Sequence, residues 1–152
     1  MSWTALYASF FATMAFGILF NVPRKSLFTG GLVGMLGWAV FVALTVNLEI
    51  DTITATLFAA FSVATVSQIL ARRYKMPVTV FSIAGIIPLV PGGMAYATIR
   101  QFIENNYTEG VRLGSITLLM AGSIAFGLIF SGVITETFSR KRGYPKGNSS
   151  GG

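Results

Sequence analysis

The distribution of charge constrains this chain more than any other feature of its sequence. The 11 basic and 5 acidic residues lie in short clusters, and five long runs without Asp, Glu, Lys or Arg separate the clusters. These uncharged runs cover residues 1–23, 26–48, 52–71, 76–99 and 113–135. A helix needs about 20 mostly apolar residues to cross the hydrocarbon core of a bilayer. Each run is therefore long enough to be one membrane span.

A large soluble protein with buried helices is the alternative, and the length of the chain argues against it. The chain has 152 residues, of which 53% are hydrophobic and only 11% are charged, whereas a soluble domain is about one quarter charged. A chain of this size cannot bury five helices that are apolar on all sides. We therefore predict an all-α integral membrane protein, with one transmembrane domain of about five helices over residues 1–142 and a lipid bilayer around it.

Basic residues predict the orientation, because they favour the cytoplasmic side of a membrane. The charged residues of the connection after the second run are both acidic, Glu49 and Asp51. Arg100 and Arg112 lie in an outer loop, where two glutamates balance them. The other basic residues follow the first, third and fifth runs: Arg24, Lys25, Arg72, Arg73, Lys75, Arg140, Lys141, Arg142 and Lys146. This pattern predicts an N-terminus outside and a C-terminus in the cytoplasm. The composition of residues 143–152 predicts a flexible cytoplasmic tail or a cloning remnant.

The missing residue types exclude several functions. The chain has no Cys and no His, so disulfides, the usual zinc sites, Ser-His triads and thiol catalysis are excluded. No ionisable residue lies inside an uncharged run, and no nucleophile–base pair is available there. We expect no enzymatic activity, no metal and no cofactor. The net charge of +6 is better explained by topology and anionic lipid headgroups than by nucleic acid, which we do not expect as a partner.

Small residues in the second span (about residues 27–46) predict a packing face. Gly30 and Gly34 lie four residues apart, a spacing that lets two helix backbones approach closely. The alternative is that glycine is simply common in membrane helices.

Polar residues in the third span (about 53–71) and small residues in the fifth (about 113–138) predict further contacts. Thr65 and Gln68 share a helix face, and an unpaired amide in hydrocarbon costs several kcal/mol. We expect an interhelical hydrogen bond, with a polar lining of a substrate path as the alternative. Ser123, Gly127 and Ser131 recur every four residues, which predicts a second close-packing stripe.

The fourth run is unusual because its outer half contains Pro88, Pro91, Gly92 and Gly93. Each proline removes a backbone donor and clashes with the preceding turn, and the glycines free the chain to leave the helix. Backbone groups without partners at membrane depth must be buried in protein or line a polar cavity. A discontinuous helix therefore indicates a binding site. A new helix from Met94 to about Tyr107 would favour an anion at its N-terminus. A simple kink near the outer surface is the alternative.

The absence of ionisable residues within the uncharged runs argues against a self-sufficient proton-coupled carrier. Five spans instead suit one half of an inverted pair, in which a second five-span half has the opposite orientation.

The run from Ile86 to Gly93, with Tyr96 following, resembles the signature of the threonine/serine exporter family, and in particular of its small subunit, which is equivalent to the C-terminal half of full-length exporters. Pro77, Phe81, the size and the five spans also fit. The resemblance covers about residues 1–142 and is anchored mainly by residues 77–100.

This resemblance implies the export of small hydrophilic metabolites across the bacterial inner membrane. Its substrates would be threonine and serine, or a dicarboxylate such as succinate, and its partner would be a larger subunit that carries the other five-span half. A homo-oligomeric channel for small solutes or anions, or an assembly subunit that does not touch substrate, are the alternatives. The sequence does not choose between an amino acid and a dicarboxylate, since both present a carboxylate.

The working hypothesis is alternating access between two halves. The broken fourth span would supply backbone groups to the substrate carboxylate, with Tyr96 and Thr98 offering hydroxyls. Thr79 and Ser82 would line the cytoplasmic approach. Arg100 would attract a carboxylate at the outer mouth or, equally well, anchor the helix at the membrane interface.

Overall fold

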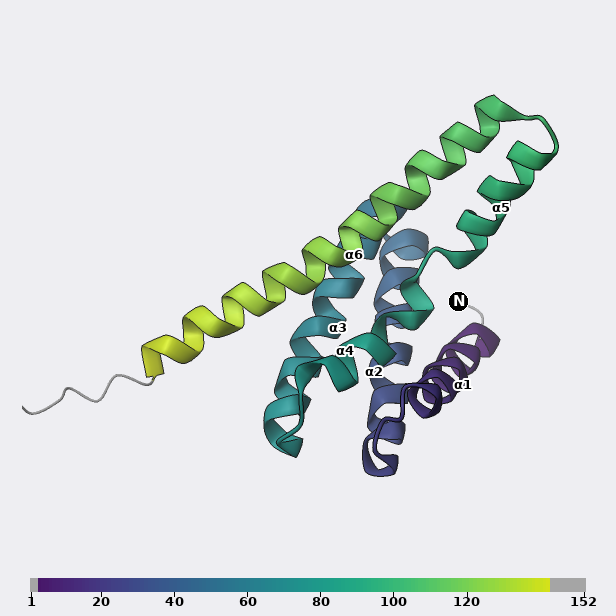
Figure 1. The fold of residues 1–152 in the computed structure, drawn as a ribbon. Coiled ribbons are helices and arrows are strands. Elements are labelled where there is room, and N and C mark those ends of the chain that lie inside the picture. The colour runs from purple at the N-terminus through teal and green to yellow at the C-terminus, as the bar shows by residue number, and fades with distance from the viewer. Residues whose placement is uncertain (1–2, 143–152) are drawn as a thin grey trace, which may run out of the picture.

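The computed structural model describes residues 3–142, and their side chains as far as residue 137. Its elements are all helical, as the sequence predicts: α1 (Trp3–Leu19), α2 (Arg24–Val42), the π-helix η1 (Ala43–Asn47), α3 (Thr52–Tyr74), α4 (Val78–Ile86), the 3₁₀ turn η2 (Ile87–Leu89), α5 (Gly92–Ile103) and α6 (Tyr107–Arg142) (Figure 1). The predicted tail, residues 143–152, lies outside the described residues.

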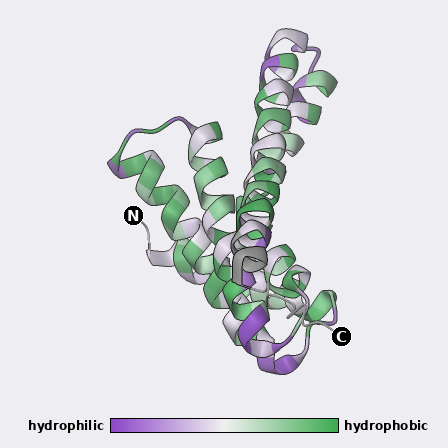
Figure 2. Ribbon diagram, turned by 90° about the vertical axis from the view of Figure 1, so that its left-hand side faces the viewer, coloured by the Kyte–Doolittle hydropathy of each residue, from purple (hydrophilic) through white to green (hydrophobic). Residues whose placement is uncertain are grey.

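Three helical segments are long and apolar enough to cross a membrane, namely Arg24–Asn47, Thr52–Tyr74 and Tyr107–Thr137. The bent pair of Val78–Leu89 and Gly92–Ile103 makes a fourth if it counts as one span. The remaining apolar helix, α1, has 17 residues, which is at the lower limit for a span. Hydrophobic residues dominate the helices and hydrophilic residues gather near their ends (Figure 2). The chain is therefore a multi-pass membrane protein.

Helix α3 begins and ends with clear local signals. The carboxylate of Asp51 accepts hydrogen bonds from the backbone N–H groups of Ile53, at 3.3 Å, and Thr54, at 3.0 Å, which satisfies donors that a helix start leaves unpaired. These bonds, led by the one from Thr54, lower the pKa of Asp51. At the other end, Lys75 adopts a left-handed conformation with φ of 52°, and the Met76 N–H donates to the Ala71 carbonyl.

Helix α3 lies at the centre of the bundle, where it packs against α2, α4 and α6, while α1 packs mainly against α2. Several core side chains are small, and they let the helices approach closely. The core consists of Val33, Ala59, Ala60, Val63, Leu89 and Ile124.

The segment after the break is helical, as the sequence predicts for Met94 to about Tyr107, but α5 begins earlier, at Gly92, and ends at Ile103. The outer loop expected to hold Arg100 and Arg112 is only a short turn, because α6 already begins at Tyr107. An ion pair stabilises each helix next to the turn. Arg100 pairs with Glu104 at 2.7 Å on one side, and Arg112 pairs with Glu109 on the other. Asn105, with φ of 62°, makes the turn between them.

The hairpin of α5 and α6 projects beyond the bundle (Figure 1). Helix α6 has 36 residues and is therefore roughly 54 Å long at a rise of 1.5 Å per residue, much longer than the hydrocarbon core. The predicted fifth span is its middle and C-terminal part.

Candidate functional site

The fourth hydrophobic run is broken where the sequence predicts it. Helix α4 ends at Ile86, η2 contains Pro88, and the chain leaves the helical conformation at Val90, whose ψ is 126°. The Val90 N–H donates to the Ile87 carbonyl, and the Gly92 N–H donates to the Val90 carbonyl at 2.7 Å. The two helical segments are bent by 49°. The prolines remove the donors that would continue the helix, so a new helix starts at Gly92.

The two glycines that follow this break have open space around them. Gly92 and Gly93 are exposed, and a Cβ added to either would meet no heavy atom within 4 Å. Val90 is 53% exposed and Tyr96 is 71% exposed. Helix α5 buries none of its residues, and it packs mainly against α6. The described part of the chain therefore leaves the exposed side of the break uncovered.

Two predicted residues beyond the break already have partners. The Thr98 hydroxyl donates to the Met94 carbonyl of its own helix at 2.8 Å, and its methyl group faces Gly114 of α6. The Arg100 Nε donates to Glu104 at 2.7 Å, with both side chains largely exposed. The structure thus groups Pro88, Pro91, Gly92, Gly93 and Tyr96 along the break, while Arg100 forms an ion pair on the hairpin.

Thr79 and Ser82, the predicted lining of the approach, lie before the break on α4 and face a different part of the molecule. Helices α4 and α6 both pack on α3 but hardly on each other, which leaves a groove of about 580 Å³ between them. Its lining is Ala64, Gln68, Val78, Thr79, Ser82, Ile83, Ile86, Leu128, Ile129, Gly132, Val133 and Glu136. Four of these residues are polar, so the groove combines apolar walls with a small polar set, as solute sites usually do.

The floor of the groove is held by hydrogen bonds between α3 and α6. The Gln68 Nε2 donates to the Ser131 Oγ at 3.0 Å, and the Thr65 and Ser131 hydroxyls lie 3.1 Å apart. Ser131 is 1% exposed and Gln68 is 8% exposed. The interhelical hydrogen bond that the sequence predicts for Gln68 is present in the structure. Gln68 also lines the groove, and a place in a substrate path stays a prediction.

Small residues bring α6 into backbone contact with α3. A Cβ on Gly127 would lie 2.9 Å from the Leu57 carbonyl oxygen and 2.9 Å from the Phe61 nitrogen. Ser123 and Ser131 are buried on the same stripe. Since Gly127 lies against residues 57–61 and Ser131 against residues 65–68, the two helices run in the same direction.

Gly30 and Gly34 of α2 are also buried, but they face different helices. A Cβ on Gly34 would clash with Thr13 of α1, and a Cβ on Gly30 would lie 3.8 Å from Ala84 of α4.

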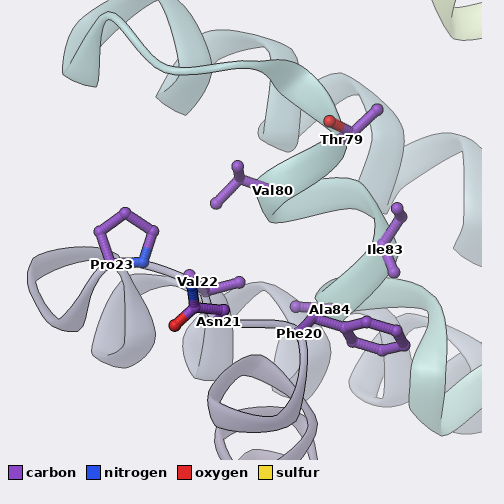
Figure 3. A pocket seen from close by; sticks show the side chains of 8 residues that line it. All are labelled: Phe20, Asn21, Val22, Pro23, Thr79, Val80, Ile83 and Ala84. Atoms are coloured by element: carbon purple, nitrogen blue, oxygen red, sulfur yellow. The ribbon is translucent and has the colours of Figure 1, made fainter.

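A smaller cavity of about 210 Å³ lies on the other side of α4 (Figure 3). The turn between α1 and α2 forms one wall, and α4 forms the other. Its lining is Phe20, Asn21, Val22, Pro23, Thr79, Val80, Ile83 and Ala84. Thr79 and Ile83 line both this cavity and the larger groove.

Sequence reasoning missed Glu136. This residue directly follows the fifth uncharged run, so it reads as a charge that marks the end of a span. Helical spacing is the signal that could have placed Glu136 on the groove face. The i, i+3, i+4, i+7 pattern of a single helix face is followed by Ile129, Gly132, Val133 and Glu136, and all four line the groove.

Residues 5–134 match the family described as Threonine/Serine exporter, ThrE. The chain is 27% identical over 140 residues to an uncharacterized protein of Haemophilus influenzae, an alignment that covers 85% of this chain and 47% of that protein. It is 27% identical over 126 residues to a threonine/serine exporter of Corynebacterium glutamicum, covering 83% of this chain and 25% of that protein. The chain thus spans about half the length of the first relative and a quarter of the second.

No solved structure matches the chain. The family match covers most of its length and includes the break, the groove floor and the whole close-packing stripe, while Glu136 lies just beyond it. The chain belongs to the threonine/serine exporter family.

Proposed function

We propose that this chain is a subunit of an exporter of small carboxylate-bearing metabolites in the bacterial inner membrane. The observation that carries the proposal is the break between α4 and α5, where Gly92 and Gly93 are open on their outer side. Backbone at membrane depth that has lost its helical partners cannot face lipid. A solute, water or a second protein must therefore meet this surface.

A larger partner subunit with a second five-span half is the second protein that we propose. The chain matches only 47% of the Haemophilus relative and 25% of the Corynebacterium exporter, so a complete transporter of their kind contains more than this chain supplies. Our topology has five spans, with α1 as a short first span and the pair α4–α5 as the fourth. Its N-terminus is outside and its C-terminus is cytoplasmic, as the basic clusters indicate.

In this mechanism the substrate passes between the groove and the break. The Gly92 N–H already donates to the Val90 carbonyl, but the next N–H groups of α5, those of Gly93 and Met94, have no intrahelical acceptor. They favour an anion and bind the substrate carboxylate beside Tyr96. Thr79 and Ser82 line the approach from the cytoplasm. Threonine and serine are the proposed substrates, and succinate is the dicarboxylate alternative.

The test is a bulky substitution at the break. Gly92→Leu and Gly93→Leu should abolish threonine export when introduced into the chromosomal copy in the native cells, while the amount of protein in the membrane stays unchanged. Because a Cβ at either position touches nothing in the chain, a loss of export would report contact with substrate or partner rather than misfolding. Gly122→Leu is the matched control, since Gly122 also has open space around it.

Normal export from both break variants would contradict the proposed site. A conductance from the purified chain alone would favour the channel alternative. A loss of export that is matched by a loss of the complex would favour an assembly subunit.

A further inference from the structure

Glu136 places a carboxylate in the wall of the groove between α4 and α6. It is exposed, and it shares the groove with Gln68, Thr79 and Ser82. No Lys or Arg lines this groove among the residues that the structure describes, and Arg72 lines a separate groove of about 200 Å³. Glu136 forms no ion pair with any other described residue. Among the described residues that line the groove, Glu136 therefore carries the only charge.

Each neutral polar group of the groove offers an acceptor. One amide N–H of Gln68 donates to Ser131, which leaves the carbonyl oxygen as an acceptor and the second N–H as a donor. The Ser82 hydroxyl donates its proton to the Val78 carbonyl at 3.1 Å, so its lone pairs are what it can present to a ligand. The Thr79 hydroxyl makes no hydrogen bond within the described part of the chain, so it can accept as well as donate.

A groove whose one described charge is a carboxylate, with neutral acceptors beside it, favours a cation that carries N–H donors. A primary ammonium has three such donors and no acceptor, and charge-assisted hydrogen bonds to a carboxylate are about twice as strong as neutral ones. A dianion such as succinate would instead be repelled. A carboxylate on a membrane helix also needs a water-filled cavity or a partner group, because lipid offers neither.

We propose that Glu136, with Gln68, Thr79 and Ser82, is a recognition site for the ammonium group of an amine-bearing solute. This inference rests on the proposed export function and deepens it, because it selects amino acids over dicarboxylates. Helix α6 supplies the charge, α3 supplies the floor, and the first two turns of α4, before the break, supply the hydroxyls.

The experiment compares transport of threonine, 3-hydroxybutyrate and succinate in everted membrane vesicles from the native cells. 3-Hydroxybutyrate is threonine without its amine. The ratio of kcat/KM for threonine to that for 3-hydroxybutyrate should fall roughly ten- to hundred-fold in Glu136→Gln, the range expected for one charge-assisted hydrogen bond. Glu136→Asp should retain most of the preference. Glu109→Gln, which removes an exposed carboxylate from the outer hairpin, should retain all of it.

A kcat/KM ratio in Glu136→Gln equal to that in Glu109→Gln would overturn the inference, whether transport is lowered equally for both solutes or for neither. Thr79→Val provides a second variant of nearly the same shape at an exposed position, and it should lower the ratio without lowering protein levels. Vesicles that lack the chain distinguish a failure of the proposed export function from a failure of the ammonium site. Unchanged threonine transport there would remove the proposed function, whereas chain-dependent transport with an unchanged ratio in Glu136→Gln would remove only the ammonium site.

Discussion

Substitution of Gly127 by alanine tests the backbone contact between α3 and α6. The new Cβ would lie 2.9 Å from the Leu57 carbonyl oxygen, 2.9 Å from the Phe61 nitrogen and 3.0 Å from the Ala60 Cβ. Two of these atoms belong to the backbone and cannot rotate away. The helices must therefore separate by about half an ångström to restore ordinary contact, and overpacking of this kind costs about 1–3 kcal/mol.

Two other glycines on α6 serve as matched controls. Gly122 and Gly132 have no heavy atom within 4 Å of an added Cβ, so Gly122→Ala and Gly132→Ala should gain helix propensity, up to about 1 kcal/mol. Gly127→Ala gains the same propensity but should still be less stable than the wild type. The expected difference in unfolding free energy between Gly127→Ala and the controls is therefore about 1–3 kcal/mol.

The assay is unfolding of the purified protein from mixed detergent micelles by added SDS, followed by far-UV circular dichroism. Gly127→Ala should unfold at a lower SDS fraction than both controls. If all three variants unfold at the same SDS fraction, the close α3–α6 contact is wrong.

Two further predictions concern stability. Ser131→Ala removes the buried group that Gln68 bonds and should destabilise the protein by about 0.6–1.7 kcal/mol in the same SDS assay; Ser115→Ala, which loses only a bond within its own helix, should change it little. Asp51→Asn keeps an N-cap residue and should match the wild type at neutral pH. The hydrogen bond from Thr54 lowers the pKa of Asp51 in the folded protein below its ordinary value of 3.8. The stability that the Asp51 carboxylate contributes is therefore fully present above pH 3.8, and it is lost as the pH falls through the pKa of the folded protein. A thermal unfolding series toward low pH should therefore show a smaller decline for Asp51→Asn than for the wild type, and parallel curves would refute this role.

The sequence predicted the features that depend on local chemistry. The uncharged runs became apolar helices, because charge is excluded from hydrocarbon whatever the tertiary arrangement. The break at Pro88 and Pro91 followed from the missing backbone donors. The contact face at Gln68 followed from helix periodicity, although its partner, Ser131, could be identified only from the packed structure.

Other features depend on how the helices are arranged. The charges between residues 100 and 112 suggested a loop, whereas pairing at i+3 and i+4 spacing makes them compatible with helices. Glu136 looked like the end of a span, because only the packing of α4 and α6 on α3 places it in a groove. The exposed face of α5 could not be predicted either, since the sequence does not show which helix lacks a neighbour.

The central claim is that the groove beside α4 is a water-accessible part of the substrate path. The chain has no Cys, so a single introduced Cys can report on one position. Ser82→Cys in everted vesicles should react with a membrane-impermeant thiol reagent, and threonine should slow that reaction. Leu118, which is 74% exposed on α6, provides the control, since Leu118→Cys should face lipid and stay unreactive. If Ser82→Cys is as unreactive as Leu118→Cys, or reacts at the same rate with and without threonine, the groove is not part of the path.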